Sequence, residues 1–380
     1  MFELYFFAAH PNPANHFVEY AQVLEERGVP YQVFAEKSLT EKFSRFSSRL
    51  RMIDSSDFSR EEFMEDLLSS IHEQGMAVMD VSSEFFLEFQ KRLAVKKPFV
   101  KRCVYYDNPE PFVPGGYSRL ASKMIALAQY VLFANSSLER KVLLKREVLE
   151  ESPGLDIDLS HVGTFGVGFQ SIKEAESIKK IRREEGQRIR LDFLERHRIK
   201  EQGQRIFVYV GGANETYYFE AFPHFVRMIK SLFDRSDESL KNTIFILQQH
   251  PRAESEGNFD ANEAKKLFLC KDPSDSFQFV VSDLKTLESL AIAQGVFYYQ
   301  TSMAAQFPLA DVPLVAQAAH EMYPDILMKT GFPFLGDPER MGEFLARERN
   351  TEEILIRKVE DELGISGLWK ENLLRFISNL

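Results

Sequence analysis

Residues 205–214 read Arg-Ile-Phe-Val-Tyr-Val-Gly-Gly-Ala-Asn, a short apolar run that stops at two glycines. A run of this kind, followed by the helical apolar spacing of Tyr217–Phe233, predicts a buried strand that leads into a helix. The same alternation of strand and helix continues toward the C-terminus. The further strand candidates of this half are Thr243–Gln248, Phe277–Val281, Gly295–Tyr299 and Val312–Ala316.

An earlier series of alternating elements precedes this one. Its strand candidates are Phe2–Ala9, Tyr31–Ala35, Met76–Val81, Arg102–Tyr106 and Tyr130–Asn135. Strands separated by helices predict βαβ units and parallel sheets. We therefore predict an α/β protein with two Rossmann-like domains facing a central cleft. The expected divisions are a domain at 1–170, a charged helical connector at 171–204, a second domain at 205–350 and C-terminal helices at 351–380 that pack back on the first domain.

Length and charge narrow the functional class. The chain has 380 residues, more than one ordinary hydrophobic core holds. Its 47 basic and 57 acidic side chains give a formal charge of −10, which argues against a general nucleic-acid binder. The two cysteines suit neither a disulfide framework nor a four-ligand zinc site. The first ten residues read as a strand rather than an export signal, so we expect a cytoplasmic protein.

Loops that directly follow strands are the natural places for a ligand in open α/β sheets. Three such loops in the second half carry suitable residues: Gly211-Gly212 with Asn214, His250-Pro251-Arg252, and Gln300-Thr301-Ser302. Glycines allow close approach of the backbone to a ligand, arginine grips a diphosphate, and hydroxyls at a helix start seat an anion. Each loop also has a purely structural interpretation: a tight turn, a proline turn, or an N-cap.

These loops, in this order, resemble the donor half of the GT-B superfamily of sugar-nucleotide enzymes. That superfamily includes glycosyltransferases, hydrolysing UDP-N-acetylglucosamine 2-epimerases and CDP-glycerol transferase-like polymerases. The resemblance covers residues 205–320 closely, and the first half only as a general α/β pattern. It implies an N-terminal acceptor domain and a C-terminal donor domain. It also implies that the donor diphosphate is bound by residues of the three loops: Gly211, Gly212, Asn214, His250, Arg252, Gln300, Thr301 and Ser302.

Many members of the superfamily carry a glutamate a few residues after the Thr-Ser turn, where it binds the ribose. Here that stretch is Met303-Ala-Ala-Gln306, which has no acid, although Gln306 can hydrogen-bond a hydroxyl. We expect an enzyme, a metal-independent glycosyltransferase that uses a nucleotide-sugar donor and no cofactor. Two alternatives are left open: a hydrolysing sugar-nucleotide epimerase, and a binding protein that kept the fold but lost catalysis.

Transfer without a metal needs a base near the acceptor hydroxyl. His10 follows the first strand, and Asp107 and Glu110 follow the fourth, so these are the catalytic candidates. Each is also a residue typical of an ordinary turn. The pair Asp156 and Asp158 is the nearest approach to a metal motif, but no strand precedes it, and we expect no metal site.

The acceptor is not specified by the sequence, and a lipid-linked acceptor is one expectation. It rests on the basic segment 91–102, which holds six Lys and Arg residues and no acid. Such a segment suits peripheral contact with an anionic membrane surface. It is equally typical of a solvated helix end.

Overall fold

The protein is described by a computed structural model, which divides into two compact units. The first comprises Met1–Gln170 and Leu363–Leu380, and the second Ser171–Glu362. The structure describes residues 2–54, 61–107, 116–135, 162–169, 172–212, 215–249, 262 and 277–379, with side chains for all of these except 116–119.

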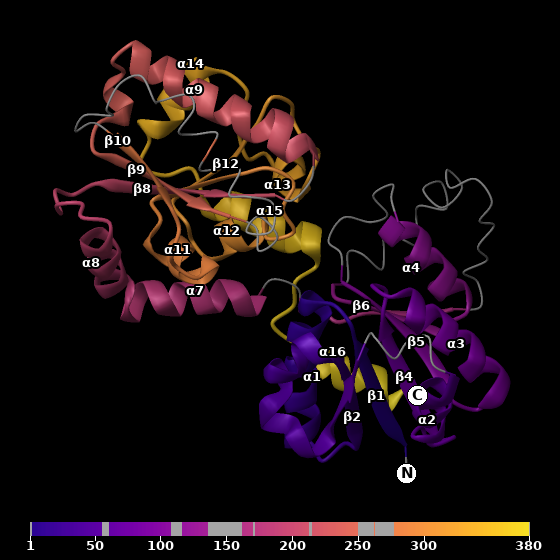
Figure 1. Cartoon of the computed structure of the whole chain (residues 1–380). Helices are drawn as coiled ribbons and strands as arrows, with labels where there is room; N and C mark the ends of the chain where they lie inside the picture. The colour runs from indigo at the N-terminus through magenta and orange to yellow at the C-terminus, as the bar shows by residue number, and fades with distance from the viewer. Residues whose placement is uncertain are drawn as a thin grey trace. The chain divides into compact units, whose positions relative to one another are not determined.

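A seven-stranded sheet forms the centre of the first unit, and all its described strand pairs are parallel (Figure 1). The strand order is β3-β2-β1-β4-β5-β6-β7. Chain order reverses between β1 and β4, so this is the topological switch point of the sheet. The strands are β1 (Glu3–Ala8), β2 (Tyr31–Glu36), β3 (Leu50–Ile53), β4 (Gly75–Asp80), β5 (Lys101–Tyr106), β6 (Tyr130–Phe133) and β7 (Gly163–Gly166).

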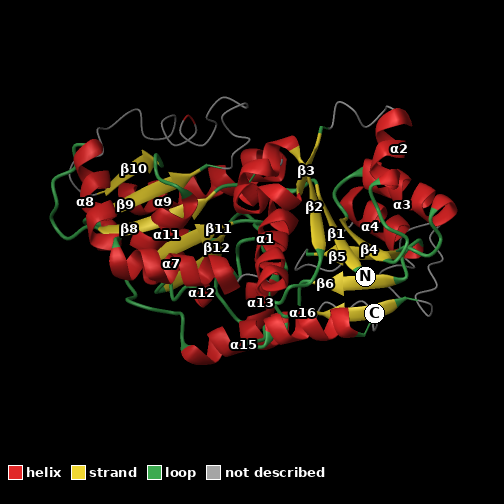
Figure 2. Cartoon of the chain, turned by 90° about the horizontal axis from the view of Figure 1, so that it is seen from below, coloured by secondary structure: helices red, strands yellow, loops and turns green. Residues whose placement is uncertain are grey.

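Helices cover both faces of this sheet (Figures 1 and 2). One face packs against α2 (Glu61–Ser69), α3 (Glu84–Lys96) and α4 (Gly116–Ala126) in a single apolar cluster. The other face packs against α1 (Pro11–Glu26) and the C-terminal helix α16 (Trp369–Ser378). A 3₁₀ segment, η1 (Lys37–Arg49), joins β2 to β3.

Many phenylalanines lie at these sheet–helix interfaces. Phe7 stacks on Phe34 with ring centroids 4.6 Å apart. Trp369 of α16 lies 4.5 Å from Phe169 and 6.2 Å from Tyr20 of α1, measured between centroids. Large rings of this kind bury much apolar area, and here they fix the C-terminal helix to the first unit.

The second unit is built on a six-stranded sheet whose described pairs are also all parallel. The strand order is β10-β9-β8-β11-β12-β13, with the switch point between β8 and β11. The strands are β8 (Arg205–Val210), β9 (Thr243–Gln248), β10 (Phe277–Val281), β11 (Gly295–Tyr298), β12 (Leu314–Ala318) and β13 (Phe334–Leu335).

One face of the second sheet packs against a π-helical turn, η3 (Tyr217–Ala221), with α9 (Phe222–Asp234) and α14 (Pro338–Leu345). On the other face lie α7 (Ile172–Glu184), α8 (Gly186–Arg196) and α11 (Thr286–Ile292) (Figure 1). The remaining helices are η4 (Glu238–Leu240), α12 (Gln306–Leu309), α13 (Ile326–Thr330) and α15 (Glu353–Leu363).

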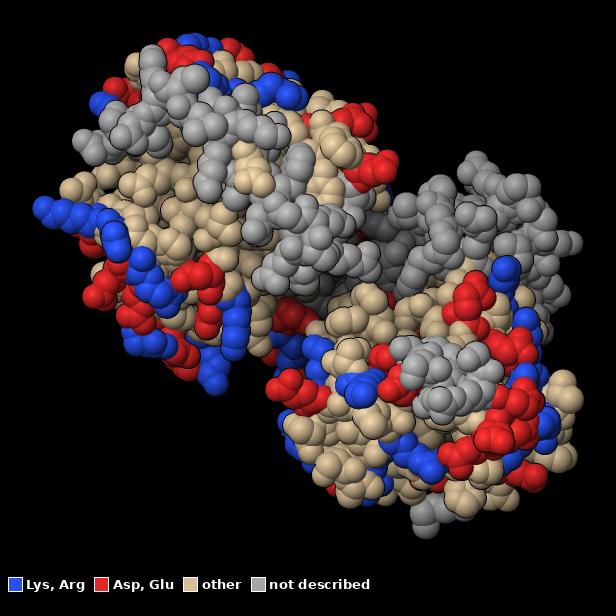
Figure 3. Space-filling model, in the orientation of Figure 1, with Lys and Arg blue, Asp and Glu red and all other residues tan. Residues whose placement is uncertain are grey.

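Two α/β domains with parallel sheets are confirmed, and some local predictions differ from the structure. The segment predicted as a connector forms α7 and α8, which pack on α11 as part of the second unit. Ile178 and Phe193 are fully buried there, although Figure 3 shows Lys, Arg, Asp and Glu side chains interspersed over the outer surface of these helices. The edge strands β3, β7 and β13 were not predicted, since each is short and has only one buried residue. Among the described helices, none has the length and apolarity to cross a bilayer.

Asn350 takes the place of a strand beside β12. Its Oδ1 accepts a hydrogen bond from Val315 N, and its Nδ2 donates to Val315 O, both at 2.8 Å. Val315 is fully buried, so its amide and carbonyl depend on this side chain. We expect Asn350→Ala to lower the free energy of unfolding by about 2 kcal/mol in urea titrations. Asn379→Ala, at an exposed helix end, is the control, and equal midpoints for the two variants would contradict this role.

Candidate functional site

In the first unit, the candidate residues gather at the carboxyl edge of the sheet, around the switch point. His10 follows β1, Asp80 ends β4, and Asp107 follows β5. Because β1, β4 and β5 are neighbours running in one direction, these residues lie at one edge. The strand-end rule thus brings His10 and Asp107 together as expected. Glu110 lies outside the described residues.

Asp80 is the central carboxylate of this edge, and it is completely buried. Its Oδ2 accepts hydrogen bonds from Ala9 N at 2.7 Å and His10 N at 3.1 Å. Its Oδ1 accepts from the amide of Ser82 at 3.0 Å and from the Ser82 hydroxyl. Burial raises the pKa of Asp80 to about 6, and the nearby charge of Asp107 adds to this, against the lowering effect of the hydrogen bonds.

Asp107 is connected to His10 through Asn12. Asn12 Nδ2 donates to Asp107 Oδ2 at 2.5 Å, and the Asn12 amide donates to His10 Nδ1 at 3.4 Å. His10 is the N-cap of α1 and is exposed, so its ring is open to a ligand. For Nε2 to act as a base, the proton of the neutral ring must be on Nδ1. The hydrogen bond from the Asn12 amide to Nδ1 opposes this tautomer, but only weakly because the bond is long.

The sequence analysis missed Asp80, Asn12 and Ser82. The signal for Asp80 was present, because it is the first polar residue after the apolar run 76–79. It was read as part of a strand core, and only the strand order shows that it lies beside His10.

The second unit also presents its candidates at the carboxyl edge of its sheet, at the switch point. Val210 of β8 pairs in register with Tyr298 of β11. The loop beginning at Gly211 and the loop that contains Gln300, Thr301 and Ser302 therefore leave the sheet side by side. The remaining donor-site candidates, Asn214, His250 and Arg252, lie outside the described residues.

Gly211 and Gly212 each have a structural role at the end of β8. The amide of Gly211 donates to Gln248 O at 2.9 Å, so it extends the β8–β9 ladder and is not available to a phosphate. A Cβ on Gly212 would lie 3.0 Å from Cγ of Tyr217, so the turn needs glycine there to pack against this ring. Close approach to a ligand would have to use Gly212 rather than the amide of Gly211.

The loop after β11 is strained and hydroxyl-bearing. Gln300 has a φ of 49°, in the left-handed region that non-glycine residues rarely adopt. Strained residues of this kind cluster at ligand-binding loops. The Thr301 hydroxyl accepts from Met303 N at 3.2 Å, so it caps a turn, while Ser302 is exposed.

The helix after this loop is shorter than predicted. The sequence predicts a helix over Met303–Leu309, but α12 spans Gln306–Leu309, and 302–305 form turns. Pro308 supplies the reason, since it has no amide to donate to Ala304. A four-residue helix offers little dipole to an anion. Gln306 is buried, and among the described residues its Oε1 has no hydrogen-bond partner.

A titratable cluster at the same edge was not predicted. His320 follows β12, and its Nε2 lies 3.1 Å from Glu220 Oε2 of the π-helical turn. The Tyr299 ring, after β11, lies 6.0 Å from the His320 ring. Burial, with the charges of Glu321 and Glu220, raises the pKa of Tyr299. π-Helical turns recur at functional sites, which is the signal that sequence periodicity does not carry.

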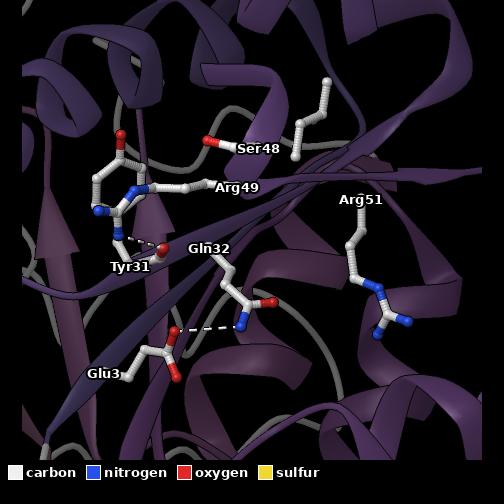
Figure 4. Close-up of a pocket in the computed structure, with 7 residues that line it drawn as sticks. Glu3, Tyr31, Gln32, Ser48, Arg49 and Arg51 are labelled. Atoms are coloured by element: carbon white, nitrogen blue, oxygen red, sulfur yellow. Dashed lines mark hydrogen bonds between the residues drawn. The ribbon is translucent and has the colours of Figure 1, made fainter.

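A depression of about 550 Å³ lies at the opposite, amino edge of the first sheet. Figure 4 shows the residues that line it. Its arginines do not converge: the Arg51 guanidinium lies on the far side of Gln32 from that of Arg49. Arg49 pairs with Glu25 at 3.4 Å, and Arg51 bonds to Ser70. Because its charges are already paired and it lies away from the switch point, we do not assign it to the candidate site. No group of metal-ligating residues is found among the described part of the chain.

The two parallel sheets, each with its switch-point loops, have the fold of the GT-B superfamily. One similar solved structure is the UDP-GlcNAc 2-epimerase from Methanocaldococcus jannaschii, with a TM-score of 0.64, 13% identity and full coverage of both chains. Another is HepE from Anabaena in complex with UDP and glucose, with a TM-score of 0.60, 11% identity and full coverage of both chains. A third is the trehalose-6-phosphate phosphatase N-terminal domain from Candida albicans, with a TM-score of 0.63 and 10% identity, covering 100% of this chain and 96% of that one.

No protein-family model and no curated protein matches the sequence. At identities of 10–13%, the likeness to solved structures establishes the fold. What the chain does with that fold must be argued from its own residues.

Proposed function

We propose that the protein is a metal-independent sugar-nucleotide enzyme that transfers a sugar from a nucleotide diphosphate to an acceptor hydroxyl. The observation that carries the proposal is the edge of the second sheet where Gly212 and the strained Gln300–Ser302 loop leave adjacent strands. Open α/β sheets bind their ligands at this kind of crevice. HepE, which shares the fold, was solved with UDP, which supports a nucleotide donor of that kind.

In this proposal the donor diphosphate is bound by the second unit. The exposed Ser302 hydroxyl donates to a phosphate oxygen, and Gly212 admits the phosphates close to the backbone. His250 and Arg252 follow β9, the strand next to β8; Arg252 supplies positive charge, and His250 is available as a hydrogen-bond partner. The Oε1 of Gln306, which has no partner among the residues described, accepts a hydrogen bond from a ribose hydroxyl, which removes the cost of a buried, unsatisfied oxygen.

The first unit supplies the base. His10 Nε2 takes the proton of the acceptor hydroxyl as its oxygen bonds to the anomeric carbon. The bond from that carbon to the diphosphate breaks, and the electron pair leaves with the diphosphate. Asp80 positions the loop, because it holds the amides of Ala9 and His10. Asp107 orients Asn12, which in turn contacts the His10 ring.

A hydrolysing epimerase is the second candidate, and a specific observation favours it. The UDP-GlcNAc 2-epimerase from Methanocaldococcus jannaschii shares the fold, and Asp107 adds a carboxylate at the same edge as His10. Epimerisation of a sugar needs several carboxylates around it, whereas simple transfer needs one base. Release of free sugar from the donor without any acceptor distinguishes this reaction.

A binding protein that kept the fold but lost catalysis is the other alternative. It predicts that the variants Arg252→Ala and His10→Ala keep the biological role of the protein.

If the acceptor is linked to a lipid, the segment 91–102 would contact the membrane surface. Arg92 pairs with Glu61 and Glu88, and Lys96 pairs with Glu65, so much of its positive charge is offset. Val95 is 81% exposed and Phe99 77% exposed. Contact with a membrane surface would therefore rest on these two apolar side chains more than on charge.

Calorimetric titration with UDP, UDP-glucose and UDP-N-acetylglucosamine tests the donor site. We expect Ser302→Ala to weaken the affinity for the best of these ligands about tenfold, the worth of one hydrogen bond to a charged group. Ser44→Ala, at an exposed position of η1 in the other unit, is the matched control. No binding of any common sugar nucleotide at millimolar concentration would contradict the proposal.

A further inference from the structure

A pocket of about 460 Å³ lies at the amino edge of the second sheet, opposite the loops of the candidate donor site. It is formed where β8, β11 and β12 begin and where α7 and α8 lie beside α11 (Figure 1). Four arginines and one aspartate line it, and we call it the arginine pocket: Arg182, Arg190, Arg205, Arg349 and Asp311.

Arg182 is the innermost of the four. Its guanidinium donates only to backbone carbonyl oxygens, at 2.7–3.2 Å. The acceptors, near the ends of α11 and α12, are Leu290, Ala291, Ala310 and Asp311. Burial lowers the pKa of Arg182, and the positive charge of Arg349 adds to this, against the attraction of Asp311. Arg182 therefore caps two helix ends with a charge that no carboxylate within the described residues pairs directly.

Arg205, the first residue of β8, is held in the same way. It donates to the carbonyls of Leu345 and Ser239, and to the Thr243 hydroxyl at 3.1 Å. Burial lowers its pKa. Leu345 ends α14 and Ser239 lies in η4, so the Arg205 guanidinium points to the face of the sheet that α9 and α14 cover, away from Arg182.

The two outer arginines each have a carboxylate partner and spare donors. Arg349 Nη1 lies 2.7 Å from Asp311 Oδ1, and Arg190 Nε lies 3.2 Å from Glu201 Oε2. Among the hydrogen bonds of the described residues, Nη2 of Arg349 and Nη1 of Arg190 take part in none. These N–H groups are free to bind a ligand at the mouth of the pocket.

The balance of charge identifies the ligand class. Apart from Arg205, three arginines line the pocket with a single carboxylate, and with Glu201 included one positive charge remains in excess. Partly buried charges are costly unless an opposite charge offsets them. Planar guanidinium groups match the oxygens of phosphate especially well, and a phosphoryl anion would offset this excess of positive charge.

We infer that the arginine pocket binds a phosphoryl anion, either a free phosphate or diphosphate or the phosphate of a small metabolite. The ligand would sit between the guanidinium groups of Arg349 and Arg190 at the mouth and that of Arg182 within. This site lies at the sheet edge away from Ser302 and does not rest on the proposed donor function.

Pyrophosphate titrations at constant ionic strength, with the full chain, test the site. Arg349→Gln is expected to weaken pyrophosphate binding about tenfold, while Arg340→Gln, a more exposed arginine of the same unit, leaves it unchanged. Asp311→Asn is expected to tighten binding about fivefold, since it removes the negative charge that lines the pocket. Asp311 has a φ of 58°, which asparagine tolerates well, so the fold is preserved.

The opposite signs of the two variants keep the outcome clear, because a damaged fold cannot bind more tightly. Binding of glucose 6-phosphate but not of pyrophosphate, with the same response to the variants, assigns the site to a phosphorylated metabolite. The inference is overturned if wild type does not bind either probe at 10 mM, or if both variants bind like wild type. It is also overturned if Ser302→Ala alone abolishes binding, since the anion then occupies the donor loop.

Discussion

Between pH 4 and pH 7, Asp80→Asn is expected to gain up to about 3 kcal/mol of stability relative to wild type, while losing at least 100-fold in turnover. The first part follows from burial. The pKa of Asp80 is raised from 3.8 to about 6 in the folded chain, so the folded chain binds this proton more tightly than the unfolded chain does. The contribution of Asp80 to the free energy of unfolding therefore falls as the pH rises from about 4 to about 6, and stays low above that. Asparagine does not titrate, so its contribution to the free energy of unfolding does not change with pH.

The loss of turnover has a different cause. Both carboxylate oxygens of Asp80 accept hydrogen bonds, one from Ala9 and His10, the other from Ser82. Asparagine keeps one acceptor and turns an N–H₂ toward the other set of donors, which displaces the loop that holds His10. A group that costs stability at neutral pH and is nevertheless present is typical of a functional site.

Urea unfolding at pH 4, 5, 6 and 7, with turnover at pH 7, measures both effects. Asp66→Asn, an exposed aspartate of α2, is the control and should show neither. If the stability difference between Asp80→Asn and wild type does not change with pH, then Asp80 does not carry the raised pKa. Full turnover in the variant would remove Asp80 from the site while leaving the stability argument in place.

His10→Asn is expected to lower turnover by a factor of about 10²–10⁴, the usual contribution of a general base. Asparagine is also a favoured N-cap, so it can replace the bond that His10 accepts from Asn12 and leave α1 intact. The expected signature is a fall in kcat with little change in the affinity for the donor, because the proposed function assigns donor binding to the second unit.

His72→Asn is the matched control, since His72 is exposed in a turn of the same unit. Turnover and donor affinity are measured on both variants together with melting temperature. Unchanged turnover in His10→Asn would rule out His10 as the base and leave Asp107 as the next candidate. Donor affinity that falls as much as turnover would indicate a binding role for His10.

Much of the site was within reach of the sequence because strand ends are local features. An apolar run of five or six residues that stops at a polar residue marks the carboxyl end of a strand, and this rule places His10, Asp107, Gly211 and Thr301. The alternation of such runs with helices specifies an α/β protein, because each sheet face needs an apolar cover. These conclusions need no knowledge of which strands are neighbours.

Tertiary structure alone decided the rest, because it depends on strand order and packing between segments far apart in the chain. Periodicity does not say that β4 lies next to β1, and so did not show that Asp80 holds the amides of the His10 loop. It did not show that the amide of Gly211 donates its hydrogen bond to the carbonyl of Gln248. The arginine pocket joins residues from 182 to 349, which meet only because three strands begin at one edge of the sheet.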